Sequence, residues 1–263
     1  ILDQERNHYT HINRNSNGEY SGLTSDYIQS VFIDSQENIW AGSWDKGIYF
    51  LKKGSKNFIN YNTENTQGGL RSNTVMTFDE DSEGTIWIGT YNSSLHSFDP
   101  ETKRFRHYDS KPFTDMGISG NSVYKVLVDF QDNLWLGTTQ GLYKIIKEDG
   151  QGFSVVSMVG RMPQEAANNS ASNYILSLCE SRDRSIWIGT KGAGLCKYIP
   201  ETDSLVWYDR LKGLEEENVC SIIQSLDGNI WVGGNAGLSK FDREKEVFTN
   251  YTTDDGLLSN DFN

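Results

Sequence analysis

Short runs of alternating apolar and polar residues follow one another along most of the chain, and one run recurs five times. Each copy consists of an aliphatic residue, a Trp, a further apolar residue and a Gly. The copies are residues 39–42, 86–89, 134–137, 186–189 and 230–233. Their Trp residues are 47, 48, 52 and 44 positions apart, a spacing found in repeats that contain four strands each. The pattern therefore predicts a repeat protein.

Further strand-like runs surround each copy, and they predict four strands per repeat. An apolar run before the Trp gives strand A, and the Trp-Gly run is strand B. A run that opens like Gly141-Leu142 gives strand C, and one like residues 105–108 gives strand D, although in the third repeat strand D is visible only around Phe153. The turns between A and B hold Asn or Gly, such as Asn38 and Gly84, and we expect these residues to take the positive φ of tight hairpins.

Four short antiparallel strands make one blade, so we expect an all-β chain that folds as a β-propeller. The expected blades are 21–62, 68–109, 117–157, 168–209 and 214–252. Residues 1–12 resemble strand D of a preceding blade, and residues 256–263 repeat the turn that opens strand A. Both ends therefore predict that residues 1–263 are a segment of a larger propeller.

Charge and hydropathy narrow the classes of partner. The formal net charge is −12 and the isoelectric point is about 4.8. This acidity argues against a nucleic-acid surface, because phosphate contacts need clustered Lys and Arg. The chain has no apolar run of about eighteen residues, so we expect no membrane insertion by this segment.

The residues that usually carry catalysis or bind metals occur here without a suitable pattern. Cys179, Cys196 and Cys220 have no metal-ligand spacing and are odd in number. The four His residues are His8, His11, His96 and His107. The acidic stretch 79–84 fails as an EF-hand loop, since the twelfth position is Thr90 rather than Glu. We expect a hairpin turn there, and no catalytic residue, metal or cofactor.

The repeats resemble the two-component regulator propeller family. The resemblance rests on Leu-x-Ser-Asn before strand A, on Ile-Trp-Ile-Gly-Thr at residues 86–90 and 186–190, and on the Gly-Leu, Phe-Asp-Pro-x-Thr and Phe-x-x-Tyr motifs that follow. Departures are Ala41, Gly234 in place of Thr, and Glu216-Glu217 in place of Ser-Asn. In that family such repeats form the periplasmic sensor region of hybrid two-component systems, in which two propellers precede an immunoglobulin-like domain, a membrane helix and a kinase.

Two Trp residues lie outside the repeated position, so we expect them to have a different role from the five repeated ones. Five Trp at one position of every repeat indicate packing between sheets. Trp44 instead lies in the turn between strands B and C, and Trp207 lies in strand D. We expect these two to cover a blade edge or to contact a ligand or partner.

We expect the B–C turns and the D–A connections to meet at one end of the sheets, where the repeat is least uniform. An oligosaccharide site needs an aromatic face together with fixed donors and acceptors. The candidate ligand-binding residues are Trp44, Asp45, Arg71, Tyr91, Asn92, Gln140, Lys191 and Asn235.

Three functions remain open at this stage. The first is a non-catalytic, ligand-sensing segment of a periplasmic receptor in an inner-membrane protein, which controls polysaccharide utilisation genes and signals to a histidine kinase. Its partners would be an oligosaccharide, the other propeller and the immunoglobulin-like domain of the same parent chain, and a second copy in a homodimer. The alternatives are a propeller enzyme of the lyase or lactonase type and a protein-interaction scaffold.

Overall fold

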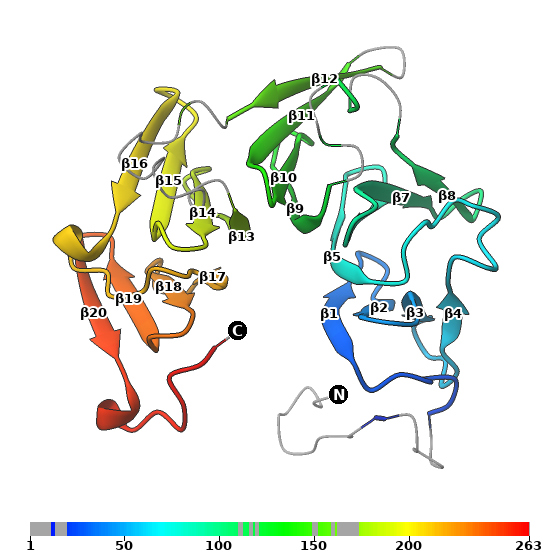
Figure 1. Ribbon diagram of the computed structural model, residues 1–263, viewed down its shortest axis with the longest axis horizontal. Coiled ribbons are helices and arrows are strands. Elements are labelled where there is room, and N and C mark those ends of the chain that lie inside the picture. Colours follow the sequence, from blue (N-terminus) through cyan, green and yellow to red (C-terminus); the bar gives the residue numbers. More distant parts are fainter. Residues whose placement is uncertain are drawn as a thin grey trace. The chain divides into compact units, whose positions relative to one another are not determined.

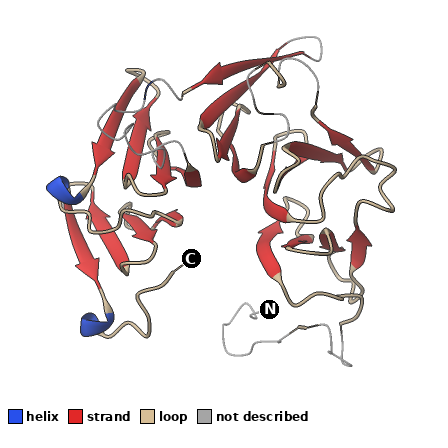
Figure 2. Ribbon diagram, viewed as in Figure 1, coloured by secondary structure: helices blue, strands red, loops and turns tan. Residues whose placement is uncertain are grey.

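The part of the chain that the structure describes folds into five four-stranded antiparallel sheets (Figures 1 and 2). The computed structural model describes residues 12–13, 20–109, 113–115, 118, 121–148, 152–158, 161 and 174–262. Within these residues the helices are the 3-10 turns η3 (Arg210–Lys212) and η4 (Thr253–Asp255), and none is long and apolar enough to cross a bilayer. The prediction of all-β propeller blades is confirmed. The chain divides into two compact units, which we describe separately as unit 1 (1–109) and unit 2 (110–263).

Unit 1 contains blades one and two, each with its strands in the order A-B-C-D. Blade one consists of β1 (Ile28–Ile33), β2 (Ile39–Ser43), β3 (Ile48–Leu51) and β4 (Ile59–Tyr61). Blade two consists of β5 (Val75–Glu80), β6 (Ile86–Thr90), β7 (Leu95–Asp99) and β8 (Arg104–His107). Strand A of blade one lies beside strand A of blade two, so neighbouring sheets are arranged as neighbouring propeller blades.

Unit 2 contains blades three, four and five in the same order. Blade three consists of β9 (Val123–Val128), β10 (Leu134–Thr138), β11 (Leu142–Glu148) and β12 (Gly152–Ser157). Blade four consists of β13 (Ile175–Glu180), β14 (Ile186–Thr190), β15 (Leu195–Ile199) and β16 (Ser204–Tyr208). Blade five consists of β17 (Ser221–Gln224), β18 (Ile230–Gly233), β19 (Leu238–Asp242) and β20 (Val247–Tyr251).

The repeated Trp packs between one blade and the next. Trp40 is 1% exposed, and its ring centroid lies 4.6 Å from that of Phe50 in its own blade and 5.1 Å from that of Phe98 in blade two. In unit 2 the rings of Trp135 and Tyr198 are 5.2 Å apart across blades three and four. All five residues of β14 are buried, because sheets cover both of its faces. The prediction of inter-blade packing is confirmed for these positions.

Trp231 is less buried than the other four repeated Trp residues. Its ring stacks on Tyr251 at a centroid distance of 5.6 Å, and the side chain is half-buried rather than enclosed. No sheet follows β20 in the part of the chain that the structure describes, so the face of blade five that carries Trp231 has no covering blade there. The expectation that each repeated Trp packs between two sheets is therefore wrong at this one position of the described residues, although the strand phase is correct.

An Asp in the A–B turn anchors the repeated Trp. In blades one, two and three the indole Nε1 donates to Oδ2 of the Asp six residues earlier, at 2.8, 2.8 and 2.9 Å. The positive φ of the first turn lies at Glu37 (62°) and not at Asn38. Asn38 instead donates from Nδ2 to Asp34 Oδ2 at 2.9 Å, so its side chain, rather than its backbone freedom, serves the turn. The stretch 79–84 forms such a turn, with Gly84 N donating to Asp81 O at 2.9 Å.

The fifth repeat departs from the others in two places that compensate for each other. In blade four the hydroxyl of Thr190 donates to Gly194 O at 2.9 Å and closes the B–C turn. Blade five has Gly234 at this position, and a Cβ there would lie 2.4 Å from the carboxyl carbon of Glu216. The buried Glu216 carboxylate accepts from Asn218 N at 2.7 Å and from Ala236 N at 2.6 Å. Glu216 thus holds the turn from the D–A connection, and only Gly leaves room for it.

The two ends of the chain were expected to belong to flanking blades. Residues 1–11, which include His8 and His11, lie outside the described residues. Residues 256–262 form no strand, but Phe262 N donates to Gly234 O at 2.8 Å. Phe262 Cβ would lie 3.1 Å from a Cβ on Gly233, much as Val219 lies against Gly189 between blades four and five. The assignment of both ends to flanking blades stays a prediction.

Candidate functional site

The B–C turns and the D–A connections bind each other at one end of each blade, which we call the rim. Trp44 N donates to Tyr27 O at 2.9 Å, and Tyr91 N donates to Thr74 O at 3.0 Å. In unit 2, Lys191 N donates to Tyr174 O at 2.9 Å. These bonds explain how turns far apart in the sequence come to lie at the same end of a sheet.

The rim of unit 1 carries an aromatic pair. The ring centroids of Trp44 and Tyr91 are 5.8 Å apart with an interplanar angle of 38°, and the side chains are 48% and 36% exposed. Thr74 Oγ1 donates to Trp44 O at 2.7 Å, which ties the turn of blade one to the connection into blade two. The two rings therefore come from adjacent blades and form one exposed aromatic surface.

Sequence reasoning missed Tyr27 as a member of this rim. Tyr27 is 71% exposed, and its carbonyl accepts from the backbone of Trp44. It occupies the position directly before strand A, where the second repeat has Thr74. An aromatic residue at a position that holds Thr74 in the second repeat and Ser122 in the third was the signal that could have identified it.

Polar groups surround the aromatic pair. Asp45 Oδ1 accepts from Ser25 Oγ at 2.6 Å, which fixes the carboxylate beside the Trp44 turn. Asn92 is exposed and has a φ of 58°, so it lies in a left-handed turn. Aromatic faces bind the apolar faces of pyranose rings, and carboxylates and amides bind hydroxyls. The rim of unit 1 thus combines the two kinds of group that sugar sites contain, an aromatic surface and polar side chains.

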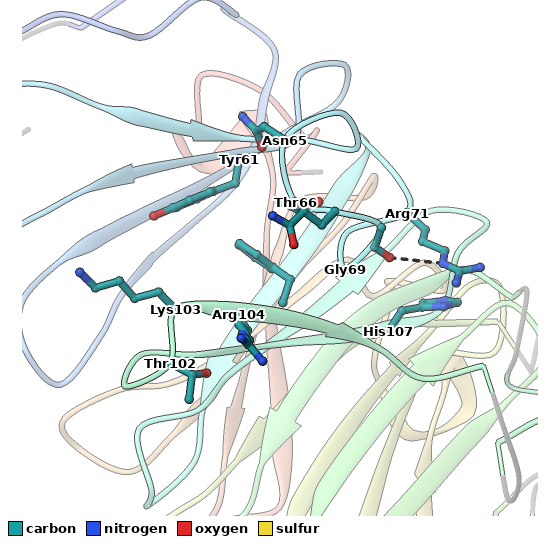
Figure 3. A pocket seen from close by; sticks show the side chains of 12 residues that line it. Tyr61, Asn65, Thr66, Gly69, Arg71, Thr102, Lys103, Arg104 and His107 are labelled. Carbon is teal, nitrogen blue, oxygen red and sulfur yellow. Dashed lines mark hydrogen bonds between the residues drawn. The ribbon is translucent and has the colours of Figure 1, made fainter.

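The side chain of Arg71 lies beside His107 of strand β8 (Figure 3). Its Nε donates to Gly68 O at 3.4 Å, and its Nη1 lies 3.5 Å from Asp109 Oδ2. Only the backbone of Arg71 stays at the rim, where Ser93 Oγ donates to its carbonyl at 3.3 Å. The structure therefore separates Arg71 from the other candidates of unit 1.

Gln140, Lys191 and Asn235 are exposed residues of unit 2. Lys191 Nζ lies 5.0 Å from the ring centroid of Tyr174, whose ring is 5.0 Å from that of Tyr124. Tyr174 holds the same rim position as Tyr27, so this rim also carries an aromatic side chain that the sequence interpretation passed over. Here a cation of the chain itself covers the aromatic face.

Trp207, the other Trp that departs from the repeat, is half-buried. It packs against the hydrophobic cluster that contains Trp135 and Ile188. Trp207 thus covers a blade edge, as one of the two expectations had it.

His96 and His107 stack inside blade two with ring centroids 4.6 Å apart. His96 Nε2 accepts from Arg71 N at 3.2 Å. His107 Nε2 donates to Ser93 O at 2.9 Å, as the amide of Asn60 donates to Lys46 O at 2.8 Å in blade one. Burial, and then the neighbouring His107 and Arg71, lower the pKa of His96 to about 3. His96 is therefore neutral at ordinary pH, and its hydrogen bond from Arg71 N joins strand C of blade two to the D–A connection.

We expect His96 to make stability depend on pH. Below its ordinary pKa of 6.5 the unfolded chain binds a proton that the folded chain rejects, so stability decreases as pH falls from 6.5 toward 3, by up to about 1.4 kcal/mol per pH unit. The variant His96→Ser with His107→Asn copies the pair of blade five, in which Ser239 Oγ donates to Asn250 Oδ1 at 2.6 Å.

Thermal melts at about pH 7 and about pH 5 measure this effect. Between about pH 7 and about pH 5 the melting temperature of the original chain should fall more than that of the double variant. Equal losses in both proteins would show that His96 does not carry the pH dependence.

The Cys residues and acidic groups offer no assembled site within the described residues. No three of the described His, Cys, Asp and Glu side chains cluster so as to hold a metal ion. Cys179, Cys196 and Cys220 are free thiols, and burial raises the pKa of each. At neutral pH these thiols are protonated, so they are weak nucleophiles and weak ligands.

Comparison with known proteins gives a family for the repeats. Residues 22–45, 69–92, 117–140 and 169–192 match the family described as two component regulator propeller. Each match runs from a D–A connection, through strands A and B, into the following B–C turn. The matches therefore contain most of the rim of blades one to four.

Three similar proteins place this result in context. A curated histidine kinase of Formosa agariphila is 25% identical over 146 residues, which are 56% of this chain and 10% of that protein. The extracellular domain of a hybrid two component system from B. thetaiotaomicron has a TM-score of 0.56 at 20% identity, covering 89% of this chain and 35% of that one. Virginiamycin B lyase from Staphylococcus aureus has a TM-score of 0.62 at 12% identity, covering 86% and 69%.

The two solved structures show the fold alone, because their identities to this chain are low. They include both the extracellular domain of a two component system and an enzyme, and a fold by itself does not decide between such functions. The chain spans about a tenth of the length of the curated histidine kinase and about a third of the extracellular domain.

Proposed function

Because the chain carries two-component regulator propeller repeats, we propose that it is a non-catalytic part of the periplasmic sensor region of a histidine kinase and that it binds an oligosaccharide at the rim of unit 1. The family match and the similarity to a curated histidine kinase support the sensor assignment. The parent protein would be anchored in the inner membrane and control polysaccharide utilisation genes. Its other propeller, an immunoglobulin-like domain and a second copy of the chain are the proposed partners in signalling.

The exposed pair of Trp44 and Tyr91 is the observation that carries the ligand assignment. Aromatic side chains that stay partly exposed cost free energy where water covers them, and two at 5.8 Å from adjacent blades form a surface wide enough for a sugar ring. Tyr27, whose carbonyl bonds to the Trp44 turn, is a further exposed aromatic residue of the same rim, and Asp45 and Asn92 supply polar groups for hydroxyls. The same arrangement would bind without reacting, since no nucleophile or unpaired base lies among these residues.

We expect Trp44→Ala and Tyr91→Ala each to weaken oligosaccharide binding at least about tenfold, or about 1.4 kcal/mol. Each change removes a stacking face while leaving the backbone bonds of the rim in place. Calorimetric titration with a panel of neutral and acidic hexasaccharides identifies the sugar that binds and measures both losses.

Tyr91→Phe is the matched control, because it keeps the ring and removes only the hydroxyl. Its affinity should stay within about threefold of the original chain. Unchanged melting curves are required of all three variants. Full affinity in both Ala variants would remove the rim of unit 1 as the sugar site.

A further inference from the structure

Strand β8 is the one strongly basic strand D of the chain's described blades. Residues 103–107 read Lys-Arg-Phe-Arg-His, in a chain with 36 acidic and 24 basic residues. The corresponding strands β4, β16 and β20 contain no Lys or Arg. β8 is also the outer edge of its sheet, and Arg104 and Arg106 are exposed. Fold requirements do not explain these cations, because the other blades form the same strand without them.

A groove of about 730 Å³ runs along this strand (Figure 3). One wall is the D–A connection of blade one with Asn65 and Thr66, and the other is β8 with the turn before it. Arg71 lies at one end of the groove beside His107, and Lys103 lies toward the other end. Cations thus stand at both ends of a site wide enough for more than one sugar ring.

The groove forms because the connection crosses β8 at a glycine. A Cβ on Gly69 would lie 2.5 Å from Phe105 O, so only Gly allows this close approach. Leu70, the next residue, is buried in the core between blades one and two. The walls of the groove are therefore held by the core and do not depend on a ligand.

The chemistry of the lining selects an anion attached to a sugar. The lining residues include Arg71, Lys103 and Arg104 but no Asp or Glu. Among the described residues, neither Lys103 nor Arg104 lies within ion-pair distance of a carboxylate, and Arg71 has only the half-exposed Asp109 at 3.5 Å. Gln67 adds an amide and the half-buried Tyr61 adds an aromatic ring, whereas the side chains of Asn65, Thr66 and Thr102 bond within their own turns and hold the walls in place. Guanidinium groups bind sulfate and carboxylate oxygens through paired hydrogen bonds, and the remaining groups suit hydroxyls and a ring face.

We infer that this groove is a second carbohydrate subsite, which binds the sulfate or carboxylate groups of an acidic oligosaccharide. The inference rests on the proposed function in that the ligand is an oligosaccharide, but it uses different residues from the aromatic rim. It narrows the ligand to a charged glycan, and it gives the cations of β8 a function.

The test variant combines Arg71→Thr and Arg104→Ser, the two arginines that line the groove. Each replacement is the residue found at the same position of another repeat, namely Thr24 and Ser204. The variant should therefore fold with an unchanged melting curve. Maltohexaose, sulfated maltohexaose, hexagalacturonate and sodium sulfate are titrated calorimetrically into the original chain and into the variant at about 50 mM NaCl, where screening is weak.

We expect at least one charged hexasaccharide to bind at least about tenfold more tightly than maltohexaose, and the variant to lose that difference. Charged sugars that bind no better than maltohexaose, or that bind the variant equally well, would overturn the inference. Binding of sodium sulfate as tight as that of the charged sugar would show a simple anion site and would also overturn it.

The rim variant Trp44→Ala separates this inference from the proposed function. If Trp44→Ala weakens sugar binding and the groove variant does not, the groove inference fails and the rim proposal stands. If the groove variant alone weakens binding of the charged sugar, the rim proposal fails and the groove stands. Absence of binding by every sugar would contradict both.

Discussion

Replacing Trp135 by Ala should lower the free energy of unfolding of unit 2 by about 3–5 kcal/mol, as truncations of large core side chains do. Trp135 is fully buried, and it belongs to a cluster that joins blades three and four through Ile175, Ile188 and Tyr198. Its removal leaves a cavity between two sheets that cannot close without moving a whole blade. Lys144 Nζ, which lies 5.1 Å from the indole centroid, would also lose its contact.

Urea unfolding followed by circular dichroism measures this loss. Trp231→Ala is the matched control, because it removes the same side chain from the same strand position where the ring is only half-buried. We expect the control to lose clearly less stability than Trp135→Ala. Equal losses, or an unchanged curve for Trp135→Ala, would contradict the packing between blades three and four.

Asp129→Ala should destabilise blade three by about 3 kcal/mol, because several buried donors lose one acceptor at once. The Asp129 carboxylate accepts from Asn133 N at 2.9 Å, from Gln131 N at 3.0 Å and from Trp135 Nε1 at 2.9 Å. It thus closes the A–B turn and holds the Trp in its packing position. Without it, the indole N–H is left in the core with no partner.

The control for this prediction comes from blade four, where Ser181 takes the place of the Asp and its Oγ accepts from Trp187 Nε1 at 3.2 Å. Asp129→Ser should therefore retain part of the stability that Asp129→Ala loses. The same urea experiment compares the two variants. If Ser and Ala prove equally destabilising, the bond to the indole contributes nothing and the turn alone explains the loss.

The sequence was a good guide wherever a position is repeated. Strands A to D, the Trp between blades and the hairpin turns all follow from period-two alternation and from five copies of one motif. Because the other repeats show where strand D lies relative to the Trp, they place it in the third repeat as well. There the sequence alone marks the strand only around Phe153, and the structure has β12 (Gly152–Ser157). Non-repeated features were harder to predict, since each rests on one residue.

Local conformation at single positions was the first feature that the sequence left open. Glu37 rather than Asn38 takes the positive φ, because the Asn38 side chain is engaged by Asp34. Tyr27 was overlooked because nothing in the alternation marks the residue before a strand as exposed. Both cases depend on which side chains contact each other in the folded chain, and the order of residues along the sequence does not determine those contacts.

The sequence by itself determined the repeat, the four-stranded blades, the inter-blade Trp and the candidate residues of the rim. The tertiary structure decided which of those candidates meet. It pairs Trp44 with Tyr91, and it turns Arg71 toward β8. Strand periodicity sets which face a side chain occupies, but the direction of a long side chain in a loop depends on neighbours contributed by other blades. Those neighbours come together only when Gly69 allows the connection to lie on Phe105.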